Sequence, residues 1–113
     1  MTEIKLYLSG RMSGEPSLNY PLFNSWATTL RDEGFEVFNP AEGVNPEAET
    51  EIGGSNRREI MRRDLVWILD EADEIAMIDG WQRSKGAKAE KATAESIGLP
   101  VRYLAKRKAK TKR

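Results

Sequence analysis

The 113-residue chain contains no cysteine and no histidine. Without cysteine the protein has no disulfide bonds and no thiolate nucleophile, and without histidine it has no imidazole base. The two absences together exclude the usual zinc sites, which are built from these side chains. If the protein is an enzyme, its chemistry must use carboxylates, hydroxyls, lysines or backbone groups, and we expect no metal or cofactor.

Long hydrophobic runs are also missing from the sequence. No apolar stretch approaches the roughly 18 residues that a membrane-spanning helix needs. The N-terminal residues MTEIKLYLSG lack the basic and then apolar pattern of a signal peptide. With 39% apolar and 32% charged residues, the composition is typical of a globular protein. We therefore expect a cytoplasmic protein with no membrane partner.

Acidic and basic residues balance to a net charge of zero, but they are unevenly distributed. The last eight residues, KRKAKTKR, contain six of the 18 Lys and Arg residues and no acid, so the rest of the chain is acidic. We interpret residues 1–105 as one domain and residues 106–113 as a basic, disordered tail. Such a tail either improves solubility or contacts nucleic acid transiently.

Hydrophobic periodicity and turn residues predict an alternating order of strands and helices. Strands are expected at residues 3–8, 35–38, 73–79 and 99–104, helices at 19–33, 56–71 and 84–97, and an exposed loop at 41–55. This order predicts an α/β fold, a Rossmann-like or flavodoxin-like three-layer sandwich with a parallel sheet of four to five strands. In such sheets ligands bind beyond the carboxyl ends of the strands, which here collect residues 9–14, 39–40 and 79–84.

Two carboxylates lie on helix faces that should pack against the sheet. Glu90 shares the small, apolar face of its helix with Gly86, Ala87, Ala94 and Ile97, whereas Lys88, Lys91 and Glu95 fall on the outer face. Asp64 lies in the middle of an apolar stripe formed by Ile60, Met61, Trp67 and Ile68, with Arg62 and Arg63 pointing elsewhere. Burying a carboxylate costs several kcal/mol unless it is paired or used.

Two interpretations of these carboxylates remain open at this point. In the first, each is neutralised by a buried hydrogen bond or by a Lys or Arg. Alternatively, they form a catalytic pair of the kind that breaks glycosidic bonds, in which one carboxylate attacks the anomeric carbon and an acid assists the leaving group.

Several segments together resemble the nucleoside 2-deoxyribosyltransferase superfamily, which includes 2'-deoxynucleoside 5'-monophosphate N-hydrolases and small phage-type relatives. They are YLSGRMSG (7–14), GFEVFNPAE (34–42), RRDL (62–65), DEIAMIDGW (73–81) and SKGAKAE (84–90). The resemblance implies that Glu90 is the nucleophile and that Asp64 contacts the substrate near the reacting centre. It also implies that Tyr7 orients the nucleophile, and that a homodimer or larger assembly forms.

The resemblance also suggests how the substrate is held. The deoxyribosyltransferases carry a carboxylate six positions before the nucleophile, whereas the monophosphate hydrolases carry a serine, and Ser84 occupies that position here. Ser84 would then contact a 5'-phosphate at a helix N-terminus, although it is equally interpretable as a helix cap. The other candidate substrate-binding residues are Ser9, Gly10, Arg11, Ser13, Asn39, Trp81 and Gly86. Trp81 either stacks on a base or packs on its own domain.

The chain departs from the family pattern near the nucleophile. A second glycine is replaced by Lys88, and the usual Leu-Gly after the glutamate is Lys91-Ala92. Three hypotheses follow: cleavage of the N-glycosidic bond of a 2'-deoxynucleoside 5'-monophosphate or deoxynucleoside, non-catalytic binding of a nucleotide on the same fold, or a nucleic-acid accessory role for the basic tail.

Overall fold

A computed structural model describes residues 3–42 and 57–105 of the chain. Its strands are β1 (Lys5–Ser9), β2 (Glu36–Phe38), β3 (Glu74–Met77) and β4 (Val101–Tyr103), and its α-helices are α1 (Tyr20–Asp32), α2 (Arg57–Asp70) and α3 (Lys85–Ser96). Two short 3-10 turns, η1 (Pro16–Asn19) and η3 (Trp81–Arg83), precede α1 and α3. The expected loop is described only at residues 41 and 42, and the basic tail at 106–113 lies outside the described residues.

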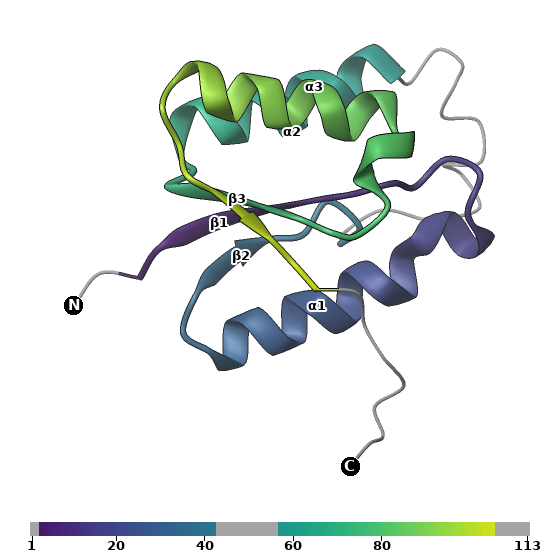
Figure 1. Cartoon of the computed structure of the whole chain (residues 1–113), viewed down its shortest axis with the longest axis horizontal. Helices are drawn as coiled ribbons and strands as arrows, with labels where there is room; N and C mark the ends of the chain where they lie inside the picture. The colour runs from purple at the N-terminus through teal and green to yellow at the C-terminus, as the bar shows by residue number, and fades with distance from the viewer. Residues whose placement is uncertain (1–2, 43–56, 106–113) are drawn as a thin grey trace.

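The four strands form one parallel sheet in the order β2-β1-β3-β4. Helices α2 and α3 cover one face of the sheet and α1 covers the other (Figure 1). The fold class predicted from the sequence, a three-layer α/β sandwich with a parallel sheet of four to five strands, is confirmed. No helix of the described residues is both long enough and apolar enough to span a bilayer.

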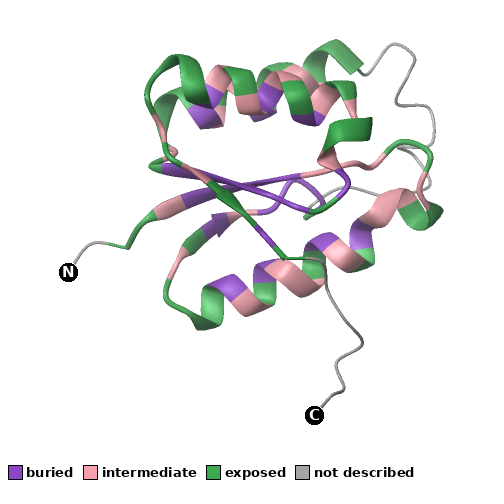
Figure 2. Ribbon diagram, in the orientation of Figure 1, coloured by how far each residue is buried: buried purple, intermediate pink, exposed green. Residues whose placement is uncertain are grey.

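The strand residues alternate between two hydrophobic clusters, one on each face of the sheet. Leu6, Leu8, Ala76 and Ile78 pack with Phe23, Ala27 and Leu30 of α1. Tyr7, Ile75 and Met77 pack with Ile68 of α2 and with Ala87 and Ala94 of α3. The central strands are therefore buried on both faces, as Figure 2 shows, because parallel strands connected by crossover helices are covered from both sides.

The strand order places a crevice at the carboxyl ends of β1 and β3. From β1 the chain first crosses to β2 on one side, and it later returns to build β3 and β4 on the other side. Ser9, the last residue of β1, is in register with Met77, the last residue of β3. Helix α3 begins beside this edge, after the turn η3, and Ser84 caps it by accepting a 3.0 Å hydrogen bond from the N–H of Ala87.

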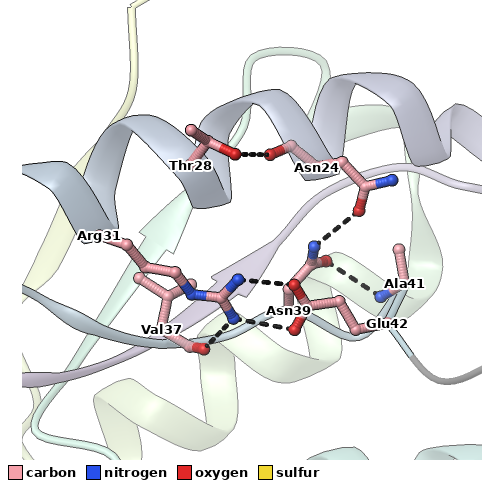
Figure 3. Close-up of polar contacts among 7 residues, drawn as sticks. All are labelled: Asn24, Thr28, Arg31, Val37, Asn39, Ala41 and Glu42. Carbon is pink, nitrogen blue, oxygen red and sulfur yellow. Dashed lines mark hydrogen bonds and ion pairs between the residues drawn. The ribbon is translucent and has the colours of Figure 1, made fainter.

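The polar contacts of Figure 3 fasten the segment that follows β2 to α1. Arg31 makes a bidentate ion pair with Glu42, at 2.6 and 2.8 Å, and also donates to the carbonyl of Val37. Asn39 donates to the side-chain oxygen of Asn24 at 2.9 Å and accepts from the N–H of Ala41. These bonds fix one rim of the crevice.

Gly10 is needed where β1 leaves the sheet. A Cβ at this position would lie 2.9 Å from the Cβ of Ile78 and 3.3 Å from the ring of Phe23, and both neighbours are buried in the core. At Gly86, by contrast, the nearest atom that a Cβ would meet among the described residues is the Ser84 hydroxyl oxygen, at 3.9 Å.

We therefore predict opposite effects of the same substitution at the two glycines. Gly10→Ala should lower the free energy of unfolding by about 1–3 kcal/mol, because the core has to shift. Gly86→Ala should raise it by about 0.5–1 kcal/mol, because alanine is the better helix former. Urea unfolding of both variants tests this, and equal stability of the two would contradict the close approach at Gly10.

Candidate functional site

The crevice contains a pocket of about 210 Å³ beyond the carboxyl ends of β1 and β3. Six of the residues predicted as site residues line it, namely Gly10, Ser13, Asp64, Ser84, Gly86 and Glu90. The segment after β1 forms one wall, the first half of α2 another, and the first two turns of α3 a third. Both predicted inward carboxylates therefore face the same cavity.

Glu90 is buried at the base of this pocket, with 8% of its surface exposed. The hydroxyl of Tyr7 donates to its Oε2 at 3.0 Å, and the hydroxyl of Ser9 donates to its Oε1 at 2.6 Å. Tyr7 and Ser9 are two residues apart on β1, so their side chains leave the strand on the same face, toward α3. Each carboxylate oxygen thus has its own hydroxyl donor.

The environment of Glu90 changes its ionisation. The pKa of Glu90 is raised to about 7, chiefly by burial and in part by the nearby charge of Asp64, although the hydrogen bonds from Ser9 and Tyr7 and the charge of Arg63 oppose the rise. The pKa of Tyr7 is raised well above its usual value, mainly by burial, so Tyr7 remains a hydroxyl donor. Glu90 consequently exchanges its proton near neutral pH.

Asp64 lies in the middle of α2 and is 5% exposed. Its Oδ1 accepts a 2.9 Å hydrogen bond from Nε of Arg63, which also makes an ion pair of the two residues. The expectation that Arg63 points elsewhere is wrong, because its long side chain folds back from the edge of the helix to the neighbouring carboxylate. Arg63 is the functional candidate that helical periodicity missed.

The sequence also missed several residues of the pocket wall. Met12, Phe23, Pro40, Ile60 and Met61 give it an apolar side, and Arg57 and Lys85 add two cations. Arg57, Ile60, Met61 and Asp64 follow the spacing i, i+3, i+4 and i+7, so one stripe of α2 lines the pocket. That periodicity was visible in the sequence, but it did not reveal that this half of the stripe extends beyond the sheet.

Tyr7 and Ser9 lie beneath the pocket rather than in its lining, and they reach it through Glu90. The resemblance implied that Tyr7 orients the glutamate, and the 3.0 Å hydrogen bond is the contact that such a role needs. Ser9 was predicted to bind substrate, but its hydroxyl is fully buried against Glu90. Its position indicates that it holds the carboxylate instead.

Three further predicted substrate contacts lie outside the pocket lining. Arg11 forms an ion pair with Glu15 at 3.1 Å, and Asn39 is buried in the contacts to Asn24 and Ala41 (Figure 3). Trp81 packs against the ring of Tyr103, with ring centroids 6.1 Å apart, and the ammonium of Lys91 lies 5.2 Å from the Trp81 ring centroid. Of the two interpretations of Trp81, packing on its own domain matches these contacts.

Ser84 and Lys88 bear on the substrate prediction in different ways. Ser84 is a helix cap whose hydroxyl oxygen accepts the N–H of Ala87, a bond that does not use the hydroxyl hydrogen, and the residue also lines the pocket. Lys88, which replaces a glycine of the family motif, is exposed and is not among the lining residues. Within the described part of the chain, no three acidic side chains gather closely enough to hold a metal ion.

A family model matches residues 4–103, which is nearly all of the described chain. The protein belongs to the family described as domain of unknown function DUF4406. No curated protein sequence matches the chain. The match of this DUF4406 protein covers both carboxylates and all four strands, so the pocket lies within the family domain.

The buried glutamate predicts a pH-dependent effect of Glu90→Gln on stability. Below about pH 4.5 the carboxyl is protonated in the folded and the unfolded protein, so its ionisation does not change the free energy of unfolding. Between about pH 4.5 and 7 only the unfolded state loses the proton, which destabilises the folded protein by up to about 3 kcal/mol above pH 7. Glu90→Gln should remove this loss.

Chemical denaturation of both proteins at pH 5 and pH 8 measures the effect. The stability of Glu90→Gln relative to the native protein should be clearly greater at pH 8 than at pH 5. Glu95→Gln, an exposed change on the same helix, is the matched control and should show no such trend. A relative stability of Glu90→Gln that does not change with pH would contradict the raised pKa.

Proposed function

We propose that this protein cleaves the N-glycosidic bond of 2'-deoxynucleoside 5'-monophosphates or deoxynucleosides, by hydrolysis or by transfer of the sugar. The observation that carries the proposal is the buried Glu90 carboxylate, which two hydroxyls hold at the base of a pocket that Asp64 also lines. The resemblance of the Glu90 and Asp64 motifs to the nucleoside 2-deoxyribosyltransferase superfamily supports the choice of the N-glycosidic bond as the bond that is cleaved.

In the proposed reaction an ionised Glu90 oxygen attacks C1' of the deoxyribose while the bond from C1' to the base nitrogen breaks. The bonding electron pair leaves with the base, which takes up a proton, and Asp64 positions the sugar or helps in that protonation. Water or a second base then attacks C1' of the deoxyribosyl ester, loses a proton that replaces the one taken up by the first base, and releases the Glu90 carboxylate. A deoxy sugar suits this route because no 2'-hydroxyl withdraws electrons from the developing positive charge at C1'.

The hydrogen bonds of Tyr7 and Ser9 suit a nucleophile of this kind. They keep both oxygens of Glu90 in fixed positions, so the carboxylate needs little reorganisation before it attacks. Positive charge that develops on the sugar would favour the ionised form of Glu90, whose pKa of about 7 in the free pocket leaves much of it protonated at neutral pH. The ionisation of Glu90 is then coupled to the development of positive charge on the sugar.

The side chains around the pocket suit a nucleotide. The apolar side of Met12, Ile60 and Met61 offers a surface for a flat base, while Arg57, Lys85 and the Ser84 hydroxyl at the start of α3 favour an anionic group. A 5'-monophosphate carries both parts. We therefore favour a nucleotide over a free nucleoside as substrate.

The reaction is tested by incubating the protein with the four deoxynucleotides and deoxynucleosides, with ribonucleotides for comparison, and separating the released free base by chromatography. Glu90→Gln should lower the rate by at least about 10³-fold, because the amide cannot act as the nucleophile. Glu95→Gln should keep the native rate. Base release that survives in Glu90→Gln would remove Glu90 from the nucleophile role.

A non-catalytic nucleotide-binding module is the second candidate. It is favoured by the pKa of Glu90, because a protonated carboxyl at neutral pH can donate a hydrogen bond to a ligand instead of attacking it. Calorimetry on the native protein separates the two functions. Tight binding of a deoxynucleotide without release of base would support the module and contradict the enzyme.

Either function predicts that Gly86→Leu weakens ligand binding. Among the described residues, the nearest atom that a Cβ at Gly86 would meet lies 3.9 Å away, and Gly86 lines the pocket together with Ser84, so a leucine side chain would occupy part of the cavity. We expect the dissociation constant for a deoxynucleotide to rise at least about tenfold, the equivalent of about 1.4 kcal/mol. Lys88→Leu adds the same side chain on the exposed side of α3 and should leave binding unchanged. Unaltered binding to Gly86→Leu would mean that the ligand lies elsewhere.

A further inference from the structure

Arg63 makes three contacts at the edge of the pocket. Its Nε donates to Asp64 Oδ1 at 2.9 Å, and its terminal nitrogen donates to the carbonyl of Pro40 at 3.3 Å. Its guanidinium lies 5.8 Å from the ring centroid of Phe38. The residue thus joins α2 to the end of β2, while its side chain remains 40% exposed.

Besides the direct attraction between its charge and an ionised Glu90, Arg63 is connected to Glu90 by two further routes. Phe38 stacks on Tyr7, with ring centroids 5.3 Å apart, and the Tyr7 hydroxyl donates to Glu90. The second route is electrostatic, since Asp64 and Glu90 face the same pocket and their like charges repel each other. The guanidinium of Arg63 lies beside the Asp64 carboxylate, with Nε 2.9 Å from Oδ1, and so brings a positive charge next to it.

Glu90 is surrounded by a small set of polar and charged groups in the described part of the chain. Tyr7 and Ser9 face it from β1, and Asp64 with its partner Arg63 faces it from α2. Arg57 of α2 and Lys85 of α3 line the same pocket. Among these described groups Asp64 is the one negative charge, so its state affects how readily a second carboxylate can ionise.

We propose that Arg63 is a positioning residue: it binds both the Pro40 carbonyl and the Asp64 carboxylate, and thereby holds Asp64 in place and offsets its charge, so that Glu90 can ionise beside it. Its importance for catalysis rests on the proposed function, in which Glu90 attacks as the carboxylate. The effect on the ionisation of Glu90 does not require any reaction and can be measured on the protein alone.

The test uses protein with ¹³C-labelled glutamate and follows the Glu90 carboxyl resonance by NMR as the pH is changed. The Glu90 signal is identified by its loss in Glu90→Gln. In Arg63→Gln the midpoint of the Glu90 titration should move upward, by several tenths of a pH unit to about one unit, because the charge of Asp64 is no longer offset. Arg62→Gln removes the same charge from the neighbouring exposed position and should leave the midpoint unchanged.

Two further variants separate electrostatics from packing. Arg63→Lys keeps the positive charge and should return the midpoint most of the way, whereas a purely structural role for Arg63 would change stability without moving it. In an Asp64→Asn background, Arg63→Gln should cause a smaller shift than in the native protein, because the charge that Arg63 offsets is already gone. A full-sized shift there would mean that the direct attraction between Arg63 and the ionised Glu90 accounts for the whole effect, and it would overturn the role through Asp64.

An unchanged Glu90 midpoint in Arg63→Gln, or an equal shift in Arg62→Gln, would overturn the inference. Neither result depends on whether the native protein releases free base. Conversely, failure of the native protein to cleave any deoxynucleotide would count against the proposed function and leave the titration result standing. If base release is observed, the acidic limb of its pH profile should move upward in Arg63→Gln together with the NMR midpoint.

Discussion

Burial of the Glu90 carboxylate constrains the surrounding fold, because an ionisable group inside a protein is stable only when hydrogen bonds satisfy it. The two donors come from alternate positions of the central strand β1, Tyr7 and Ser9, so the register of β1 against α3 has to be maintained. A shift of one residue would turn both hydroxyls to the α1 face and direct Leu6 and Leu8 at the carboxylate. The same contacts therefore satisfy Glu90 and specify how α3 packs on the sheet.

The aromatic side chains under the pocket serve this arrangement. Tyr7 stacks on Phe38, and Phe38 stacks on Trp67 of α2 with ring centroids 4.9 Å apart. The stack holds the Tyr7 ring from the β2 side, while its hydroxyl remains directed at Glu90. Since the three rings come from β1, β2 and α2, the position of the hydroxyl depends on elements that are distant in sequence, and the fold fixes it more firmly than a loop would.

Much of the fold and part of the site could be predicted from the sequence because both depend on short periodicities. The repeat of helix α3 brings Glu90 to the same face as Ala87 and Ala94, and all three are buried. The direction of a long side chain at the edge of a helix face is not set by that repeat, so periodicity does not predict the contact of Arg63 with Asp64. For Ser9, the sequence predicted a loop position just after a strand, whereas Ser9 is the last residue of β1, and which face it occupies depends on pairing that only the sheet determines.

The site also shows how one helix can contribute to both the core and the pocket. The second half of α2 packs Trp67 and Ile68 against the sheet, whereas Arg57, Ile60 and Met61 of the first half continue the same stripe into the pocket. Asp64 stands at the boundary, so its carboxylate is buried on the core side and faces the cavity on the other. A residue at this boundary gains the low exposure that strengthens electrostatic interactions while it still reaches a ligand. Arg63, one position earlier and 40% exposed, supplies the opposite charge from the solvent side, where its own desolvation costs little.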